Sequence, residues 1–157
     1  MPKPLKYNGY AIVFQEVYNE ITLAFNISGC PYHCSGCHSQ YLWKYEGDNL
    51  IDNFANVIDK YSGYITCVCF MGGDQNMEEL EMALKICKSL NLKTCVYSGS
   101  SDLNKFKDLF QYLDWLKLGK YDERFLCDKH VVNGVKLATL NQYMYKIVHT
   151  DDGYVIT

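Results

Sequence analysis

The sequence predicts a single α/β domain built around a parallel β-sheet. The first observation is a repeated order of apolar strand, loop of small residues, and amphipathic helix, which is typical of βα units. The second is that the strand candidates are apolar on both faces, as expected for strands covered on both sides. The third is length, because 157 residues without a linker or repeat fit one domain, residues 1–157.

The individual elements follow from local patterns in the chain. Predicted core strands span Ile21–Ser28, Tyr64–Met71, Lys93–Tyr97 and Trp115–Leu118. Predicted helices span Asn49–Tyr61, Met77–Leu90 and Asp102–Tyr112. Tyr10–Val17 is expected to form a strand or hairpin arm, Tyr121–Ala138 mostly loop, and Tyr143–Val148 and Tyr154–Thr157 small terminal strands.

Composition narrows the classes of function. Hydrophobic residues make up 48% and charged residues 21% of the chain, which is ordinary for a globular protein. The net charge of −3 gives no basic surface for nucleic acid. No segment has the pattern of a signal peptide or a membrane span, so we expect a cytoplasmic protein without a membrane partner. Eight cysteines in such a chain favour metal or redox chemistry over disulfides.

Three of these cysteines are concentrated in one loop. Cys30, Cys34 and Cys37 follow the predicted strand Ile21–Ser28, in a segment that glycine and proline keep from being helical. This spacing suits an iron–sulfur cube in which each thiolate binds a different iron. Because a cube has four irons, three cysteines leave one iron open to a substrate or cofactor.

Two other interpretations of the cysteine loop remain open. A structural zinc ion would use the three thiolates with His33 or His38 as fourth ligand. Zinc modules usually draw their ligands from two separated halves, whereas both histidines are adjacent to cysteines. The cysteines would otherwise be buried packing residues, although a loop rich in glycine and proline is an unusual place for them.

Further candidate residues follow the other predicted strands. In parallel sheets and barrels, ligands bind at the carboxyl ends of the strands. Those ends carry Gly72-Gly73-Asp74, Ser98-Gly99 and Gly119-Lys120. The glycines would let a ligand approach the backbone closely. Asp74 would accept hydrogen bonds from an ammonium group of the ligand, and Lys120 would pair with its carboxylate. The alternatives are ordinary turns, an Asp74 that caps the next helix, and a solvated lysine.

The remaining cysteines are predicted to have other roles. Cys67 and Cys69 lie two apart on one strand and share a face, where core packing is favoured over metal binding. Cys87 and Cys95 also have the pattern of core residues. Cys127 and His130 form a Cys-x-x-His pair for which no further ligands are evident.

The cysteine loop followed by Gly72-Gly73-Asp74 resembles the radical SAM enzymes. The resemblance implies a short, incomplete (β/α) barrel in which Cys30, Cys34 and Cys37 bind a 4Fe-4S cluster. It also implies that S-adenosylmethionine binds the open iron through its amino and carboxylate groups, with Asp74 at the ammonium group. In such enzymes one electron cleaves the cofactor to methionine and a 5′-deoxyadenosyl radical, which abstracts a hydrogen atom.

The segment from Cys34 to Trp43, with a small residue before Cys37, is similar to the activating proteins of anaerobic ribonucleoside-triphosphate reductases. The segments 97–99, 119–122 and 141–142 resemble the same group, although Leu118 replaces its usual acid. The resemblance implies a large glycyl radical enzyme as partner and a flavodoxin or ferredoxin as electron donor. Alternatives are a small-molecule radical SAM enzyme, such as one that forms a deazapurine, and a zinc-binding adaptor.

The aromatic residues around the cysteine loop have two possible roles. Tyr32, Tyr41 and Trp43 would form part of the surface that docks the partner, since tyrosine and tryptophan are common interface anchors. Alternatively, they would pack over the cluster and exclude oxygen and water.

Overall fold

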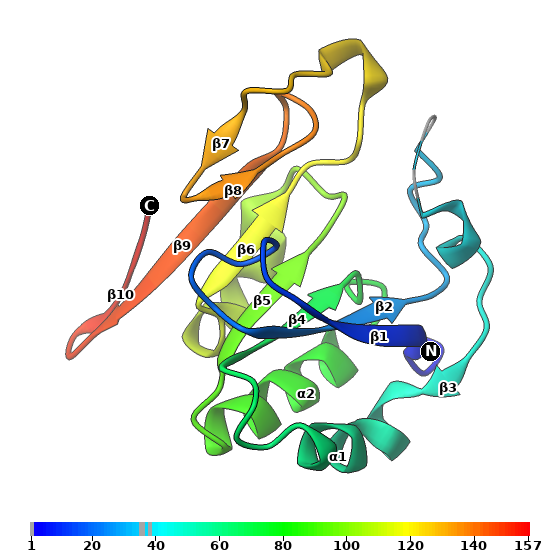
Figure 1. The fold of residues 1–157 in the computed structure, drawn as a ribbon, viewed down its shortest axis with the longest axis vertical. Coiled ribbons are helices and arrows are strands. Elements are labelled where there is room, and N and C mark those ends of the chain that lie inside the picture. The colour runs from blue at the N-terminus through cyan, green and yellow to red at the C-terminus, as the bar shows by residue number, and fades with distance from the viewer. Residues whose placement is uncertain (1, 35–36, 38) are drawn as a thin grey trace.

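An open, eight-stranded mixed sheet forms the centre of the protein (Figure 1). The computed structural model describes residues 2–34, 37 and 39–157. The strand order is β10-β9-β6-β5-β4-β2-β1-β3. The strands are β1 (Lys6–Val13), β2 (Thr22–Ile27), β3 (Asp48–Asn49), β4 (Cys67–Met71), β5 (Lys93–Tyr97), β6 (Trp115–Leu118), β9 (Tyr143–Thr150) and β10 (Gly153–Ile156).

The middle of the sheet is parallel and its two sides are antiparallel. Strands β2, β4, β5 and β6 run in one direction, while β1, β3, β9 and β10 pair antiparallel to their neighbours. Ala24, Cys69, Cys95 and Trp115 are matched in register across the four parallel strands. The carboxyl ends of these strands therefore emerge at one edge of the sheet, as the sequence predicts.

The helices cover one face of the sheet (Figure 1). They are α1 (Leu50–Lys60), α2 (Met77–Ser89) and the 3₁₀ helix η2 (Leu103–Tyr112). Phe25, Phe54 and Phe70 join α1 to β2 and β4, with ring centroids 5.3–5.9 Å apart. No helix in the described ranges is long and apolar enough to cross a membrane.

The opposite face is covered by two connecting segments instead of helices. Val17, from the loop at residues 14–19, packs with Val135 and Leu137 against Cys67, Cys69, Cys95 and Trp115. This loop also contacts the sheet through its backbone, because the Tyr97 hydroxyl donates to the Glu16 carbonyl at 2.5 Å. It contacts the second segment through Tyr18, which lies against Gly134. The sheet thus has a second, smaller core.

The structure differs from the sequence-based expectation at the first strand and at one helix. The first strand spans Lys6–Val13, before the predicted Tyr10–Val17, because residues 14–19 turn onto the face of the sheet. The predicted helix at 102–112 is a 3₁₀ helix. Its buried residues Phe106, Leu109 and Phe110 are three and four positions apart, a spacing that fits either helix type.

The segment expected to be loop contains short regular elements. These are the 3₁₀ helix η3 (Glu123–Phe125) and the hairpin of β7 (Val131–Val132) and β8 (Val135–Lys136). The hairpin turns at Asn133-Gly134, where both residues have positive φ. An Asn-Gly pair between apolar residues is a strong hairpin signal, so this element was predictable from sequence.

Candidate functional site

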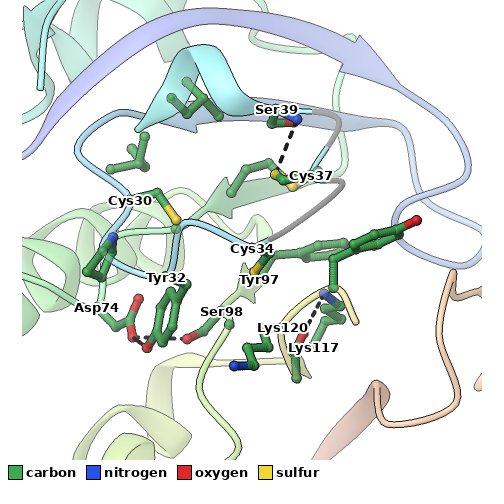
Figure 2. A pocket seen from close by; sticks show the side chains of 18 of the residues that line it. Cys30, Tyr32, Cys34, Cys37, Ser39, Asp74, Tyr97, Ser98, Lys117 and Lys120 are labelled. Atoms are coloured by element: carbon green, nitrogen blue, oxygen red, sulfur yellow. Dashed lines mark hydrogen bonds between the residues drawn. The ribbon is translucent and has the colours of Figure 1, made fainter. Parts of the chain in front are cut away.

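A cavity of about 230 Å³ lies at the carboxyl ends of the parallel strands (Figure 2). It brings together most of the residues that the sequence singled out. The predicted site residues that line it are Cys30, Cys34, Cys37, Gly72, Asp74, Ser98, Gly99 and Lys120. Gly73 is not among the lining residues; its φ is +116° and a Cβ there would meet Leu80 at 3.2 Å. Packing within the backbone turn is therefore one reason for glycine at this position.

The three cysteine thiols are free, partly buried and directed to the same cavity (Figure 2). The backbone N–H of Ser39 donates to Sγ of Cys37 at 3.3 Å, and the N–H of Cys30 donates to the Leu42 carbonyl at 2.9 Å. Burial raises the pKa of the Cys34 thiol, while a hydrogen bond with the backbone of Tyr121 opposes this. N–H groups aimed at sulfur are typical of the surroundings of iron–sulfur clusters.

The described residues of the cysteine loop can be compared with the needs of a single metal ion and of a cluster. In the described part of the chain, no three His, Cys, Asp or Glu side chains are grouped to hold one metal ion. A cube requires thiolates on separate irons, and the cavity that the cysteines share has room beside them. His33 stacks on Trp43, with ring centroids 4.6 Å apart, and is not a lining residue. The other proposed zinc ligand, His38, lies outside the described residues, and so does Gly36.

Asp74 is held by three other side chains at the cavity. Its carboxylate accepts hydrogen bonds from the Tyr32 hydroxyl at 2.8 Å and the Ser98 hydroxyl at 2.9 Å, and pairs with Lys105 at 2.7 Å. The side chain is 2% exposed. It does not cap α2, because Asn76 does so by accepting from the Glu79 N–H. The capping alternative is therefore excluded, and the carboxylate is held within the cavity wall.

Two glycines allow close packing at the cavity. A Cβ on Gly99 would lie 2.7 Å from the Tyr32 ring, so the ring rests directly on the backbone after β5. Gly119 has a φ of +104°, and a Cβ there would lie 2.8 Å from the Asn141 carbonyl oxygen. Both positions therefore need glycine for contact between loops, in addition to any approach by a ligand.

Sequence reasoning did not assign roles to Lys117 and Gln142, which also line the cavity. Burial lowers the pKa of Lys117 to about 8, and the negative potential of Cys34 and other cysteines opposes this shift. The Gln142 side chain accepts from the Ala138 and Thr139 N–H groups and donates to the Gly119 carbonyl. The sequence did contain a signal for Lys117. It lies two positions after Trp115 in β6, so the two side chains are expected on the same face of the sheet.

The remaining singled-out residues lie away from the cavity. Cys67, Cys69, Cys87 and Cys95 are fully buried in the two cores. His130 hydrogen-bonds the Gln142 carbonyl at 2.7 Å, and neither it nor Cys127 lines the cavity. Leu118 is 3% exposed and packs in the core on the helical face.

A second cavity of about 740 Å³ adjoins the first. The two share Tyr97, Lys117 and Gln142 as lining residues. The outer walls of the second are residues 14–19 and the β7–β8 hairpin with its continuation to Ala138. The cavity beside the cysteine loop therefore continues into the second cavity, along the face of the sheet.

Free thiols around an open cavity at parallel strand ends define a candidate iron–sulfur protein. A comparison with family models supports this class: the model described as "4Fe-4S single cluster domain" matches residues 21–141. This match covers more than half of the chain and includes all of the cavity-lining cysteines. The chain belongs to the 4Fe-4S single cluster domain family and is an iron–sulfur protein. No curated protein and no solved structure matches it.

Proposed function

We propose that this protein is a radical SAM activating enzyme that installs a glycyl radical on an anaerobic ribonucleotide reductase. The observation that carries the proposal is the shared cavity. The three cysteines, Gly72 with Asp74, Ser98-Gly99 and Lys120 approach one another at the ends of four neighbouring parallel strands. The open sheet is compatible with a short, incomplete barrel.

Each proposed role follows from the chemistry of the side chain. Cys30, Cys34 and Cys37 would hold three irons of the cluster, and Asp74 and Lys120 would bind the ammonium and carboxylate groups of S-adenosylmethionine. Gly72, with a φ of +109°, keeps the backbone beside them free of a Cβ. The bound cluster would supply the electron that cleaves the sulfonium. That electron would come from a flavodoxin or ferredoxin.

The second cavity supports a protein substrate. It adjoins the cluster cavity along Tyr97 and Lys117, and its outer walls are residues 14–19 and the β7–β8 hairpin with its continuation to Ala138. A segment of a large partner would reach the cofactor from this side, bringing a glycine Cα to the 5′ carbon. A small-molecule substrate is the alternative that this cavity also accommodates.

The aromatic residues divide between the two roles predicted for them. Tyr32 is bonded within the site, and Trp43 stacks on His33 with its indole N–H buried. Tyr41 is 52% exposed, so it alone of the three remains suited to docking. We therefore assign Trp43 to support of the cysteine loop.

We expect Trp43→Leu to accelerate loss of the cluster severalfold without weakening partner binding, because the His33 ring loses its stacking surface. The measurement is decay of visible absorbance during challenge with a chelator, alongside partner affinity by calorimetry. Tyr41→Leu is the matched control and should leave the decay unchanged. Weaker partner binding with a stable cluster in Trp43→Leu contradicts this assignment.

The proposed function is tested by anaerobic reconstitution with iron and sulfide, followed by S-adenosylmethionine and dithionite. Formation of 5′-deoxyadenosine supports radical SAM chemistry, and a glycyl radical signal on an added reductase supports the partner. Consumption of S-adenosylmethionine in step with a small molecule, without a protein partner, favours the alternative enzyme. A colourless protein with one zinc ion and no product rejects both.

A further inference from the structure

One carboxylate oxygen of Asp74 connects the cysteine loop to two other parts of the chain. Oδ2 of Asp74 is the common acceptor for Tyr32, Ser98 and Lys105. Tyr32 belongs to the cysteine loop, Ser98 follows β5, and Lys105 lies in η2. None of these three contacts uses Oδ1. The two oxygens of one carboxylate are therefore in different environments.

Lys105 reaches this carboxylate from outside the cavity. Its side chain is 36% exposed, whereas that of Asp74 is 2% exposed. Tyr32, Asp74 and Ser98 line the cavity, and Lys105 does not. A ligand inside the cavity can therefore approach Asp74 without displacing Lys105.

The ion pair is the only contact of the three that carries a positive charge. Partial burial lowers the pKa of Lys105, but the hydrogen bond and charge of Asp74 outweigh this and raise it overall. Tyr32 and Ser98 are neutral donors to the same oxygen. Because a buried carboxylate without a counter-ion is costly, the position of Asp74 depends on Lys105.

We propose that Lys105 is a positioning residue with two effects. It fixes Oδ2 of Asp74 and leaves Oδ1 for the ammonium group of the ligand. Through Asp74 it also holds Tyr32, which lies against Gly99, and so keeps the cysteine loop in place. The first effect rests on the proposed function, because it assumes S-adenosylmethionine as ligand. The second requires only the cluster.

The test compares Lys105→Met, Lys105→Arg and Lys107→Met as reconstituted proteins. Lys107→Met is the matched control, because it removes the same charge from η2 at a residue that does not contact Asp74. We expect Lys105→Met to weaken S-adenosylmethionine binding in calorimetry by about 10-fold to 100-fold, the range found for residues that orient a ligating group. It should also speed chelator-driven cluster loss severalfold. Lys105→Arg should restore both, and Lys107→Met should change neither.

A second variant tests the connection to the loop. If Lys105 acts through Asp74 and Tyr32, the double variant Lys105→Met/Tyr32→Phe loses its cluster no faster than the faster single variant. If the effects of the two single variants on the rate of cluster loss add in the double variant, Lys105 does not act on the cysteine loop through Tyr32. Unchanged or tighter ligand binding in Lys105→Met overturns the positioning role. If the unaltered protein binds no S-adenosylmethionine, the proposed function fails, yet the cluster-loss rates still decide whether Lys105 holds the loop.

Discussion

Cys34→Ser is expected to abolish both the 4Fe-4S cluster and the formation of 5′-deoxyadenosine. Iron–sulfur clusters are held by soft thiolate ligands, for which a hydroxyl is a poor replacement. The remaining Cys30 and Cys37 would leave two irons without a protein ligand. After anaerobic reconstitution, the variant should lack the visible absorbance of the unaltered protein and should contain little iron or sulfide.

Cys127→Ser is the matched control for this experiment. Cys127 is also a free, partly buried cysteine, but it does not line the cavity. The control should retain full iron content and product formation. A Cys34→Ser protein that keeps a complete cluster would contradict the ligand assignment, and loss of the cluster in Cys127→Ser would point to a different ligand set.

The sequence predicted where the site forms because its signals are local and the sheet is parallel. Each loop that it singled out follows a strand, and the register from Ala24 to Trp115 places those strand ends at one edge. The buried apolar strands therefore determine at which edge of the sheet the site forms. The glycine-containing loops that follow them indicate the residues that line it. The cavity that results includes Cys30, Gly72, Ser98 and Lys120.

The sequence could not predict contacts between distant loops. The bonds from Tyr32, Ser98 and Lys105 to Asp74 join residues 24 to 42 positions apart. Each of these residue types is common in an ordinary turn, so no local pattern distinguishes the network. The helix type of η2 was also undetermined, because its apolar spacing fits two periods. The Asn133-Gly134 turn differs, since its signal was present in the sequence.

Asp74→Asn is expected to weaken S-adenosylmethionine binding by about 100-fold or more. The amide keeps the shape of the side chain and an oxygen that can accept from Tyr32 and Ser98, but it removes the charge that attracts an ammonium group. Loss of one partner from a buried charge pair costs about 3–5 kcal/mol, and each 1.4 kcal/mol is about tenfold in affinity. The measurement is calorimetry on the reconstituted protein.

Asp122→Asn is the control for removal of a carboxylate near the cavity. Asp122 pairs with Arg124, which lowers the pKa of the Asp122 carboxyl to about 2, but it is not a lining residue. Ligand affinity should be unchanged in this variant. Unchanged affinity in Asp74→Asn as well would remove Asp74 from the ligand site and leave it only a structural role.

The double variant Asp74→Asn/Lys105→Met separates the two roles of the carboxylate. With both charges absent, no buried carboxylate lacks its counter-ion, and the introduced amide still has an oxygen for the Tyr32 hydroxyl. Cluster retention should therefore be better than in Lys105→Met alone. Ligand affinity should stay as low as in Asp74→Asn, because the ammonium group has lost its anion. Recovery of affinity together with retention would mean that the ligand depends on the shape of the loop and makes no ionic contact with Asp74.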